Sequence, residues 1–204
     1  MNFFLIPFLS SMLFLFQVSV TPPSQDPWSA ESEEAPEEAP QAVVYSFLQA
    51  FPEARAVRSH GARKAKGQWT GDRFVFQNAA ELGDISRTLN TPVAGRSGES
   101  ILFQLEAGVE SQLIFSRVPP ARKLKVFLAI PDSDLQKEKP APIGFEVRVG
   151  GKKVFETEVT GKGWNEKNLD LTLPFLLQRN FVVTFKVRSV DSHQRSLLFR
   201  GYLE

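Results

Sequence analysis

The sequence contains no cysteine and only two histidines, and these two shortages exclude several classes of function. Without cysteine there are no disulfides, no thiolate metal ligands, no cysteine nucleophile and no lipid attached to a cysteine. His60 and His193 cannot supply the three ligands of a zinc hydrolase, and neither has the setting of a Ser-His-Asp triad. The chain also lacks a Gly-x-Ser-x-Gly motif and a phosphate-cradling loop. We therefore predict that the protein is not an enzyme and carries no cofactor.

Lysine and arginine are absent from the first 40 residues, which divides the chain by charge. Residues 21–40 carry no base and six acids, which are Asp26, Glu31, Glu33, Glu34, Glu37 and Glu38. The formal charge of +1 therefore combines this acidic segment with residues 41–204, which carry 24 bases against 17 acids. This excess of positive charge is modest for a nucleic-acid-binding protein, so no nucleic-acid partner is predicted.

Residues 3–20 contain no charged side chain and read FFLIPFLSSMLFLFQVSV. The run predicts a signal peptide or membrane anchor over residues 1–20, with membrane contact through residues 3–20. The choice between the two stays open, because no base precedes the run and Val18–Val20 departs from the A-x-A cleavage pattern. Both alternatives send the remaining chain across a membrane. We predict a protein that is secreted, periplasmic or anchored in the cell envelope.

Residues 21–40 contain five prolines and the segment Glu-Glu-Ala-Pro twice in succession. Low hydrophobicity with charges of one sign cannot compensate for the entropy lost on ordering. We therefore predict an acidic, proline-rich, disordered linker that acts as a spacer. The alternative is that this acidic segment lies across the basic surface of the later part.

Residues 41–68 are expected to form a short helix and a basic loop. Apolar residues recur at helical spacing over residues 42–51, namely Val43, Val44, Phe47, Leu48 and Phe51, and Pro52 ends the run. The next stretch, a loop or a polar lead-in to a strand, forms a basic patch of Arg55, Arg58, His60, Arg63, Lys64 and Lys66. This patch could attract phosphate, an acidic polysaccharide or an anionic membrane surface, and an ordinary solvated loop is the alternative.

From residue 69 onward, apolar and charged residues alternate with a period of two. Strands are predicted at about residues 69–76, 101–105, 113–115, 124–130, 145–149, 154–159, 169–173, 181–187 and 197–202. Gly150-Gly151 supplies a hairpin turn, and no gap shows the crossover helix that a parallel sheet requires. The pattern predicts an all-β fold, an antiparallel jelly-roll β-sandwich over residues 69–204. The short helix, the disordered linker and the N-terminal apolar segment precede it.

Four motifs follow one another along about residues 95–204. They are Ser-Gly-Glu-Ser at 97–100, the hairpin over 145–154, Trp164 before Leu169-Asp170-Leu171, and the valine-rich strand over 181–187. In this order they resemble the galactose-binding-like jelly roll of carbohydrate-binding modules and discoidin-type domains. The resemblance implies the sandwich fold and a binding role for loops at one end of it. These motifs are shared by modules with different ligands, so no ligand residue is transferred.

Two tryptophans in turn-rich segments are candidate platforms for a ligand. Trp164 is followed by Asn165, and Trp69 lies close to Asp72 and Arg73. A tryptophan ring gives a rigid apolar surface, and planar polar groups beside it can bind sugar hydroxyls. We therefore predict that these five residues bind a glycan or other envelope polymer. Packing of each tryptophan against the sandwich is the alternative.

Asp132, Asp134 and Glu138 lie close enough in sequence for their oxygens to hold calcium. The segment lacks the glycine turn and the terminal acid of an EF-hand, and Lys137 and Lys139 intervene. No metal site is predicted, and calcium is only the alternative. The sequence as a whole predicts a non-catalytic binding module of an exported or envelope protein. The alternative is a structural adaptor that contacts another envelope protein and has no sugar site.

Overall fold

The structure is a computed structural model that describes residues 43–76, 83–136, 142–171, 180–189 and 194–204. The predictions for residues 1–20 and 21–40 lie outside these residues, as do Glu138 and His193. Within the described ranges, no helix has the length and apolar character needed to cross a membrane.

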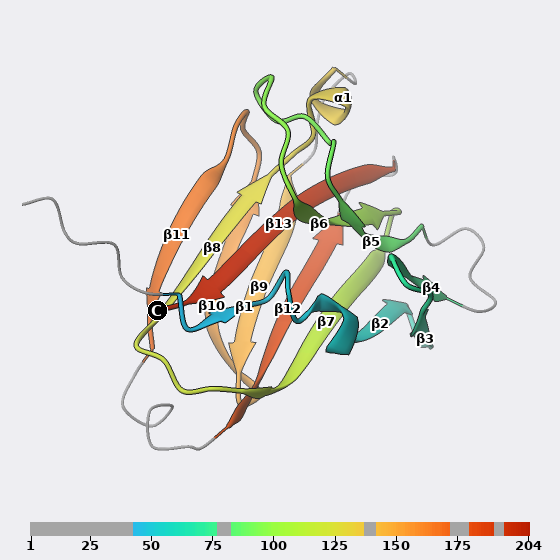
Figure 1. The fold of residues 1–204 in the computed structure, drawn as a ribbon. Helices are drawn as coiled ribbons and strands as arrows, with labels where there is room; N and C mark the ends of the chain where they lie inside the picture. The colour runs from blue at the N-terminus through green and yellow to red at the C-terminus, as the bar shows by residue number, and fades with distance from the viewer. Residues whose placement is uncertain (1–42, 77–82, 137–141, 172–179, 190–193) are drawn as a thin grey trace, which may run out of the picture. The chain divides into compact units, whose positions relative to one another are not determined.

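Almost all regular structure in the described residues is β-strand (Figure 1). The strands are β1 (Tyr45–Ser46), β2 (Arg55–His60), β3 (Arg63–Trp69), β4 (Arg73–Phe76), β5 (Ile85–Thr88), β6 (Ser100–Leu105), β7 (Val109–Val118), β8 (Lys123–Ala129), β9 (Ile143–Val149), β10 (Lys152–Val159), β11 (Asn165–Asp170), β12 (Phe181–Ser189) and β13 (Arg195–Leu203). The described helical elements are the 3-10 helix η1 (Phe51–Glu53) and the one-turn helix α1 (Asp132–Leu135). All pairs among these strands are antiparallel, so the predicted all-β, antiparallel fold class is confirmed.

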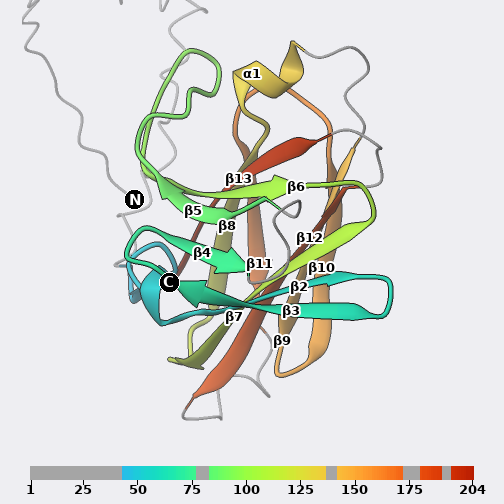
Figure 2. The ribbon, with the colours of Figure 1, turned by 90° about the vertical axis from the view of Figure 1, so that its right-hand side faces the viewer.

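Two layers share one strand. Layer A has the strand order β4-β5-β6-β13-β8-β11, with β1 beside β13, and layer B has the order β10-β9-β12-β7-β2. Strand β3 pairs with β2 through Arg63–Lys66 and with β4 through Gly67–Trp69, as the neighbouring ribbons in Figure 2 show. A Cβ atom on Gly67 would lie 2.9 Å from that of Ala56, so glycine permits the close approach at this corner.

Phenylalanine rings fill the space between the layers. Seven of the described phenylalanines are at most 1% exposed, and these include Phe47, Phe115, Phe145, Phe185 and Phe199. The Phe185 ring lies 4.5 Å from that of Phe199 and 4.9 Å from that of Phe47, measured between centroids. Such aromatic pairs add about 0.5–1.5 kcal/mol each beyond the area that they bury. The alternation seen in the sequence therefore directs one side of each strand to this core and the other to water.

The helix expected over residues 42–51 is not formed, and the structure corrects this prediction. Tyr45 and Ser46 form β1 instead, paired with Leu203 and Tyr202 of β13. A turn follows, and the helical residues of this segment are those of η1. Phe47 and Phe51 are both buried, and one turn brings them to the same side without a helix. The helical spacing therefore reflected a single turn.

The basic segment predicted as a loop is the hairpin of β2 and β3, so the sandwich starts before residue 69. Gly61, with a φ of 57°, lies at its turn. The sequence of β2 does not show an alternation of apolar and polar residues, because its inward side chains are Ala56 and Arg58 rather than large apolar ones. Trp69 accordingly ends β3 instead of starting the first strand.

The remaining strands agree with the alternation, with small shifts in their ends. Gly150 and Gly151 have φ values of 57° and 82° and form the predicted hairpin turn. The strand expected at 169–173 is β11, which starts earlier, and residue 173 lies outside the described residues. Strand β5 was not predicted, because Ile85 is its one buried side chain.

Arg58 ties β2 to layer A from inside the protein. Its side chain is fully buried and donates hydrogen bonds to the carbonyl oxygens of Gly83, of Asp84 at 3.1 Å and of Gln104 at 2.7 Å. The guanidinium also lies 4.7 Å from the centroid of the Phe76 ring. Burial lowers the pKa of Arg58 to about 10, so the group stays charged at neutral pH. Arg58 is a structural cation and does not belong to the surface patch in which the sequence placed it.

Candidate binding face

The outer surface of layer A carries two aromatic side chains where the alternation calls for polar ones. Leu124, Val126 and Leu128 of β8 are buried, so Phe127 points outward between the outward positions 125 and 129. Tyr202 of β13 likewise lies between Gly201 and Leu203, which are both buried. The register pairs Phe127 with Arg200 and Tyr202 with Lys125. We call the surface formed by the outward side chains of β13, β8 and β11, together with Trp164, the candidate binding face.

Phe127 and Tyr202 stack on each other. Their ring centroids are 5.7 Å apart and their planes are 25° from parallel. The Lys125 ammonium lies 5.9 Å from the Tyr202 centroid and forms a 2.9 Å ion pair with Glu204. The hydrogen bond to Glu204 raises the pKa of Lys125, and burial raises the pKa of the Tyr202 phenol. At neutral pH this part of the face is therefore two stacked rings, a neutral hydroxyl and a fixed cation.

Planar polar side chains of β11 border the rings. Glu166 lies opposite Phe127, and Asn168 lies opposite Lys125. Both are exposed, and the Asn168 amide donates a 3.1 Å hydrogen bond to the Glu166 carboxylate. An apolar platform next to amide and carboxylate groups is the combination that a sugar ring requires.

Trp164 extends the candidate binding face by packing against Arg200. The Arg200 guanidinium carbon lies 4.3 Å from the Trp164 ring centroid. The indole also packs against a small hydrophobic cluster of Val93, Ala129 and Leu198. The next residue, Asn165, pairs with the buried Leu128 and so points to the inner side of the sheet. The structure therefore places Trp164 on the face and directs Asn165 away from it.

Trp69, Asp72 and Arg73, the other predicted ligand residues, are not part of the candidate binding face. Trp69 packs against the main core, with its ring centroid 5.1 Å from those of Phe51 and Phe74. Arg73 pairs with Asp72 at 3.5 Å and with Asp84 at 3.3 Å. Trp69 and Trp164 thus belong to different hydrophobic clusters, and the five predicted ligand residues do not form one site.

Five members of the basic patch are exposed on the β2–β3 hairpin, namely Arg55, His60, Arg63, Lys64 and Lys66. None of its Arg and Lys side chains forms an ion pair with a residue that the structure describes. Attraction of an anion by this hairpin stays a prediction.

The two described acids of the calcium alternative have separate hydrogen-bonding partners. Asp132 accepts hydrogen bonds from the backbone amides of Ala94 at 2.9 Å and Gly95 at 3.0 Å. These bonds lower the pKa of Asp132, with Gly95 making the larger contribution. The buried Asp134 accepts a hydrogen bond from the backbone amide of Ser196. Nowhere in the described ranges do three His, Asp or Glu side chains gather in a way that could hold a metal ion.

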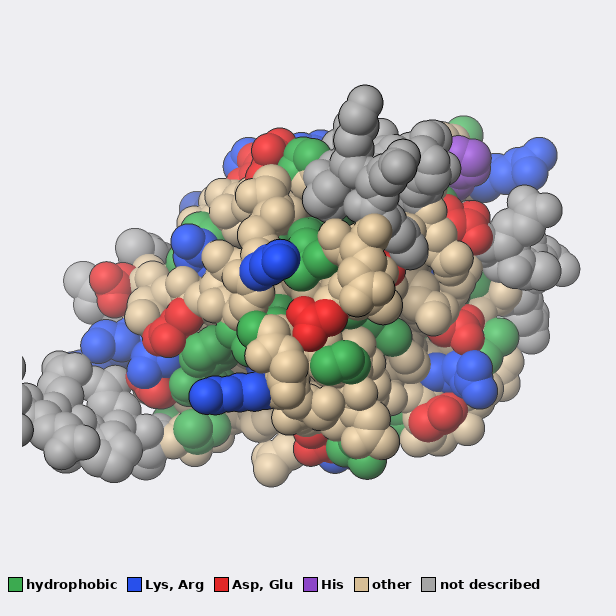
Figure 3. Space-filling model, turned by 90° about the horizontal axis from the view of Figure 1, so that it is seen from above, with side chains coloured by type: hydrophobic (Ala, Val, Ile, Leu, Met, Phe, Trp, Pro, Cys, Tyr) green, Lys and Arg blue, Asp and Glu red, His purple; other side chains and the backbone are tan. Residues whose placement is uncertain are grey.

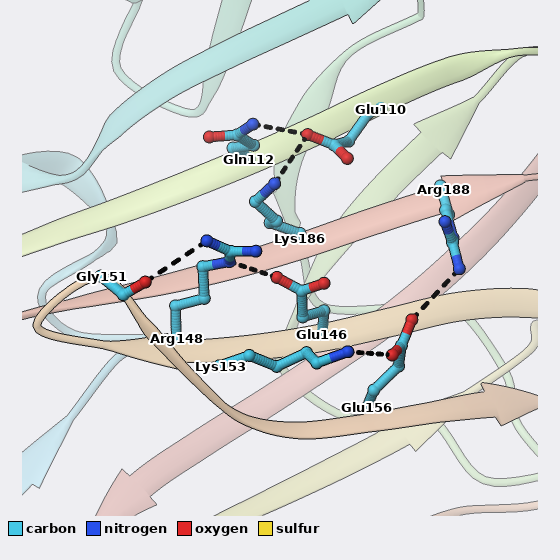
Figure 4. A network of polar contacts seen from close by, with 9 residues as sticks. All are labelled: Glu110, Gln112, Glu146, Arg148, Gly151, Lys153, Glu156, Lys186 and Arg188. Carbon is cyan, nitrogen blue, oxygen red and sulfur yellow. Dashed lines mark hydrogen bonds and ion pairs between the residues drawn. The ribbon is translucent and has the colours of Figure 1, made fainter.

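The outer surface of layer B carries ion pairs within and between its strands (Figure 4). Lys186 pairs with Glu110 at 3.2 Å, and Glu156 pairs with both Lys153 at 2.7 Å and Arg188 at 3.1 Å. A shallow depression around Gly144 is lined by Glu110, Glu146, Glu156, Lys186 and Arg188. The charges satisfy one another, as expected for the wet side of an antiparallel sheet.

The end of the sandwich that carries the β5–β6 and β10–β11 connections is shown from above in Figure 3. Basic and acidic side chains are interspersed over the described surface in this view, without a large area of one sign. The resemblance implied ligand-binding loops at one end, whereas the aromatic platform lies on the outer side of layer A. Phe127 and Tyr202 were missed as site residues. The available signal was an aromatic residue at a water-facing position of an alternating strand.

No protein-family model matches this sequence, and no curated protein matches it. Among solved structures, TmCBM61 in complex with β-1,4-galactotriose matches at 15% identity over 68% of this chain and 92% of its own, with a TM-score of 0.41. A cleaved adhesin domain of Lys-gingipain from Porphyromonas gingivalis matches at 12% identity over 73% of this chain and 97% of its own, with a TM-score of 0.46. A family 43 arabinoxylan arabinofuranohydrolase from Bacillus subtilis matches at 15% identity over 59% of this chain and 24% of its own, with a TM-score of 0.39.

These matches include a carbohydrate-binding module and an adhesin domain. Their TM-scores lie below 0.5, and they identify no ligand for this chain.

Proposed function

We propose that this chain is a non-catalytic binding module that recognises a glycan on the candidate binding face. The observation that carries the proposal is the outward stack of Phe127 and Tyr202 in a row of charged and polar side chains. Large aromatic side chains at water-facing positions are the exception on such a sheet, and they are enriched at binding surfaces.

Recognition would combine two contributions. The apolar face of a sugar ring would lie against Phe127 and Tyr202, which lose little side-chain entropy on binding. The hydroxyl groups would bond to the Glu166 carboxylate, the Asn168 amide and the Tyr202 phenol. Residues two apart on a strand lie about 7 Å apart on the same face. The three cross-strand pairs Leu198–Ala129, Arg200–Phe127 and Tyr202–Lys125 therefore form an elongated surface. Such a surface suits an oligosaccharide better than a single sugar.

The exposed apolar side chains favour this proposal over the adaptor alternative. An adaptor needs a contiguous apolar patch of several hundred Å². The large hydrophobic side chains that the structure describes as exposed are scattered over several segments, namely Val43, Val44, Val75, Leu89, Val154 and Val182. Scattered single residues of this kind are normal on any soluble surface.

A glycan array followed by calorimetric titration of the strongest hit tests the proposal. Phe127→Ala and Tyr202→Ala should each weaken binding about tenfold or more, because truncation of a central aromatic costs roughly 1–2 kcal/mol. Val182→Ala removes an outward apolar side chain from layer B and should leave the affinity unchanged. A hit whose affinity survives both aromatic substitutions would move the site elsewhere. An array without any hit would leave the adaptor as the better hypothesis.

Export remains part of the proposal and is supported by the apolar run over residues 3–20. Cell fractionation with N-terminal sequencing of the mature protein checks it. We expect the protein outside the cytoplasm, and recovery of the intact chain in the cytoplasm would contradict this.

A further inference from the structure

Arg200 holds an unusual position on the candidate binding face. It lies opposite Phe127, with its guanidinium against the Trp164 ring. On another side it lies so close to Gly98 that a Cβ atom there would come within 2.3 Å of Arg200 Nη2. The guanidinium is therefore fixed between an indole ring and the backbone of Gly98. A flexible surface arginine has no such constraint.

The hydrogen-bonding groups of Arg200 are unused in the described part of the structure. Its Nε atom is buried without a partner, and neither terminal nitrogen makes a hydrogen bond or ion pair with a described residue. Glu99, whose charge raises the pKa of Arg200, forms an ion pair with Arg87. Burial lowers the pKa of Arg200, and the charge of Glu99 opposes this shift in part. Arg58 differs at its terminal nitrogens, which donate to three carbonyl oxygens, although its Nε likewise has no partner.

An arginine that is fixed, partly desolvated and without an acceptor is prepared to bind an anion. The guanidinium carbon lies over the Trp164 ring, and Gly98 lies closer to Nη2 than to Nη1, so Nη1 is the terminal nitrogen that Gly98 crowds less. A carboxylate accepts two parallel hydrogen bonds from a guanidinium in the same plane. The stacked rings of Phe127 and Tyr202 begin directly beside this position.

We infer that the candidate binding face is specific for an acidic oligosaccharide, with Arg200 receiving a sugar carboxylate while the ring lies on Phe127 and Tyr202. This inference rests on the proposed function and names its substrate class. Gly98 and Trp164 are positioning residues, because they fix the guanidinium without contacting the carboxylate.

The test uses the full-length protein and two matched probes. One is a hexameric oligogalacturonate, and the other is the same oligosaccharide with its carboxylates reduced to alcohols. Calorimetric titration should show that the acidic probe binds about ten- to a hundredfold more tightly, as expected for charge-assisted hydrogen bonds. Arg200→Gln should abolish this preference and leave the affinity for the reduced probe within about twofold. Arg200→Lys keeps the charge but loses the planar fork, so it should retain only part of the preference.

Two further variants separate recognition from net charge and from stability. Lys64→Gln removes one positive charge from the β2–β3 hairpin and should leave the preference intact at low and moderate salt. Gly98→Ala keeps Arg200 and its charge but displaces Nη2, and it should reduce the preference for the acidic probe. The atom displaced is the end of a flexible side chain, so the thermal midpoint should change little.

The outcomes distinguish the two proposals. Equal binding of both probes, lost in Phe127→Ala, would overturn the acidic specificity and retain glycan binding. A preference that survives Arg200→Gln but disappears in Lys64→Gln would assign it to the hairpin and overturn the role of Arg200. Binding of neither probe, together with an array lacking any hit, would overturn the proposed function and the specificity with it.

Discussion

The outer surfaces of the two layers differ in the side chains that they carry and in how those side chains are paired. Layer B exposes acids and bases that pair across neighbouring strands, as Glu110 does with Lys186. Layer A carries on its outer side two stacked, half-buried rings and an arginine whose nitrogens have no acceptor in the described residues. A surface that only faces water gains nothing from desolvated, unsatisfied groups. On this difference, we place the proposed binding on layer A and regard layer B as solvated surface.

Substitution of Arg58 should have the largest effect of the predicted changes, and the effect is on stability. Arg58 has a purely structural role, so it serves as a reference for Arg200. Arg58→Met should remove about 3–5 kcal/mol of unfolding free energy, because a buried cation and its hydrogen bonds to three carbonyl oxygens are lost. Urea denaturation measures this loss. Arg55→Met, an exposed control on the same strand, should stay within about 0.5 kcal/mol of the wild type. A stable Arg58→Met variant would remove the contrast between an arginine that has three acceptors and one that has none in the described residues.

Asp132 gives a smaller, pH-dependent effect at the end of layer A. Its pKa is lowered in the folded state by the amides of Gly95 and Ala94. The stabilisation is therefore complete above the unfolded pKa of about 3.9 and is lost as the pH falls through the lower folded value. Asp132→Asn should melt below the wild type at neutral pH, and the two curves should converge in strong acid. Parallel curves from pH 7 to pH 2 would show that these hydrogen bonds do not act on the charge.

The Lys186–Glu110 pair of layer B should give the smallest effect. Lys186→Gln breaks a partly exposed ion pair and should cost at most about 1 kcal/mol. Glycan affinity should not change at all, which can be measured in the titration used for Phe127→Ala. A loss of affinity equal to that of Phe127→Ala would remove the distinction between the two layers.

The sandwich could be predicted from the sequence because its core obeys a period of two. Strands β8, β9 and β12 alternate large apolar with charged side chains, and the alternation is visible without coordinates. Strand β2 could not be predicted, because one of its inward positions holds Arg58. The carbonyl oxygens that accept its hydrogen bonds lie 25 to 46 residues further along the chain. The turn before η1 looked helical because Phe47 and Phe51 are four residues apart. Long-range pairing with β13 decided its conformation.

The candidate site was less accessible to sequence analysis. Trp164 was identified by its residue type, but its partner Arg200 lies 36 positions further along the chain. Phe127 and Tyr202 become neighbours only through the pairing of β8 with β13. Trp69 shows the opposite error, since neighbouring glycines made it look exposed while the fold packs it against Phe51 and Phe74.

Mapping of backbone amide chemical shifts during titration with the bound oligosaccharide tests the central claim most directly. The account predicts that the largest shifts fall on β8, β11 and β13, centred on Phe127, Arg200 and Tyr202. The amides of β7, β9 and β12 should remain nearly unchanged. Shifts concentrated on the charged surface of layer B, or on the β2–β3 hairpin, would contradict the assignment of binding to layer A.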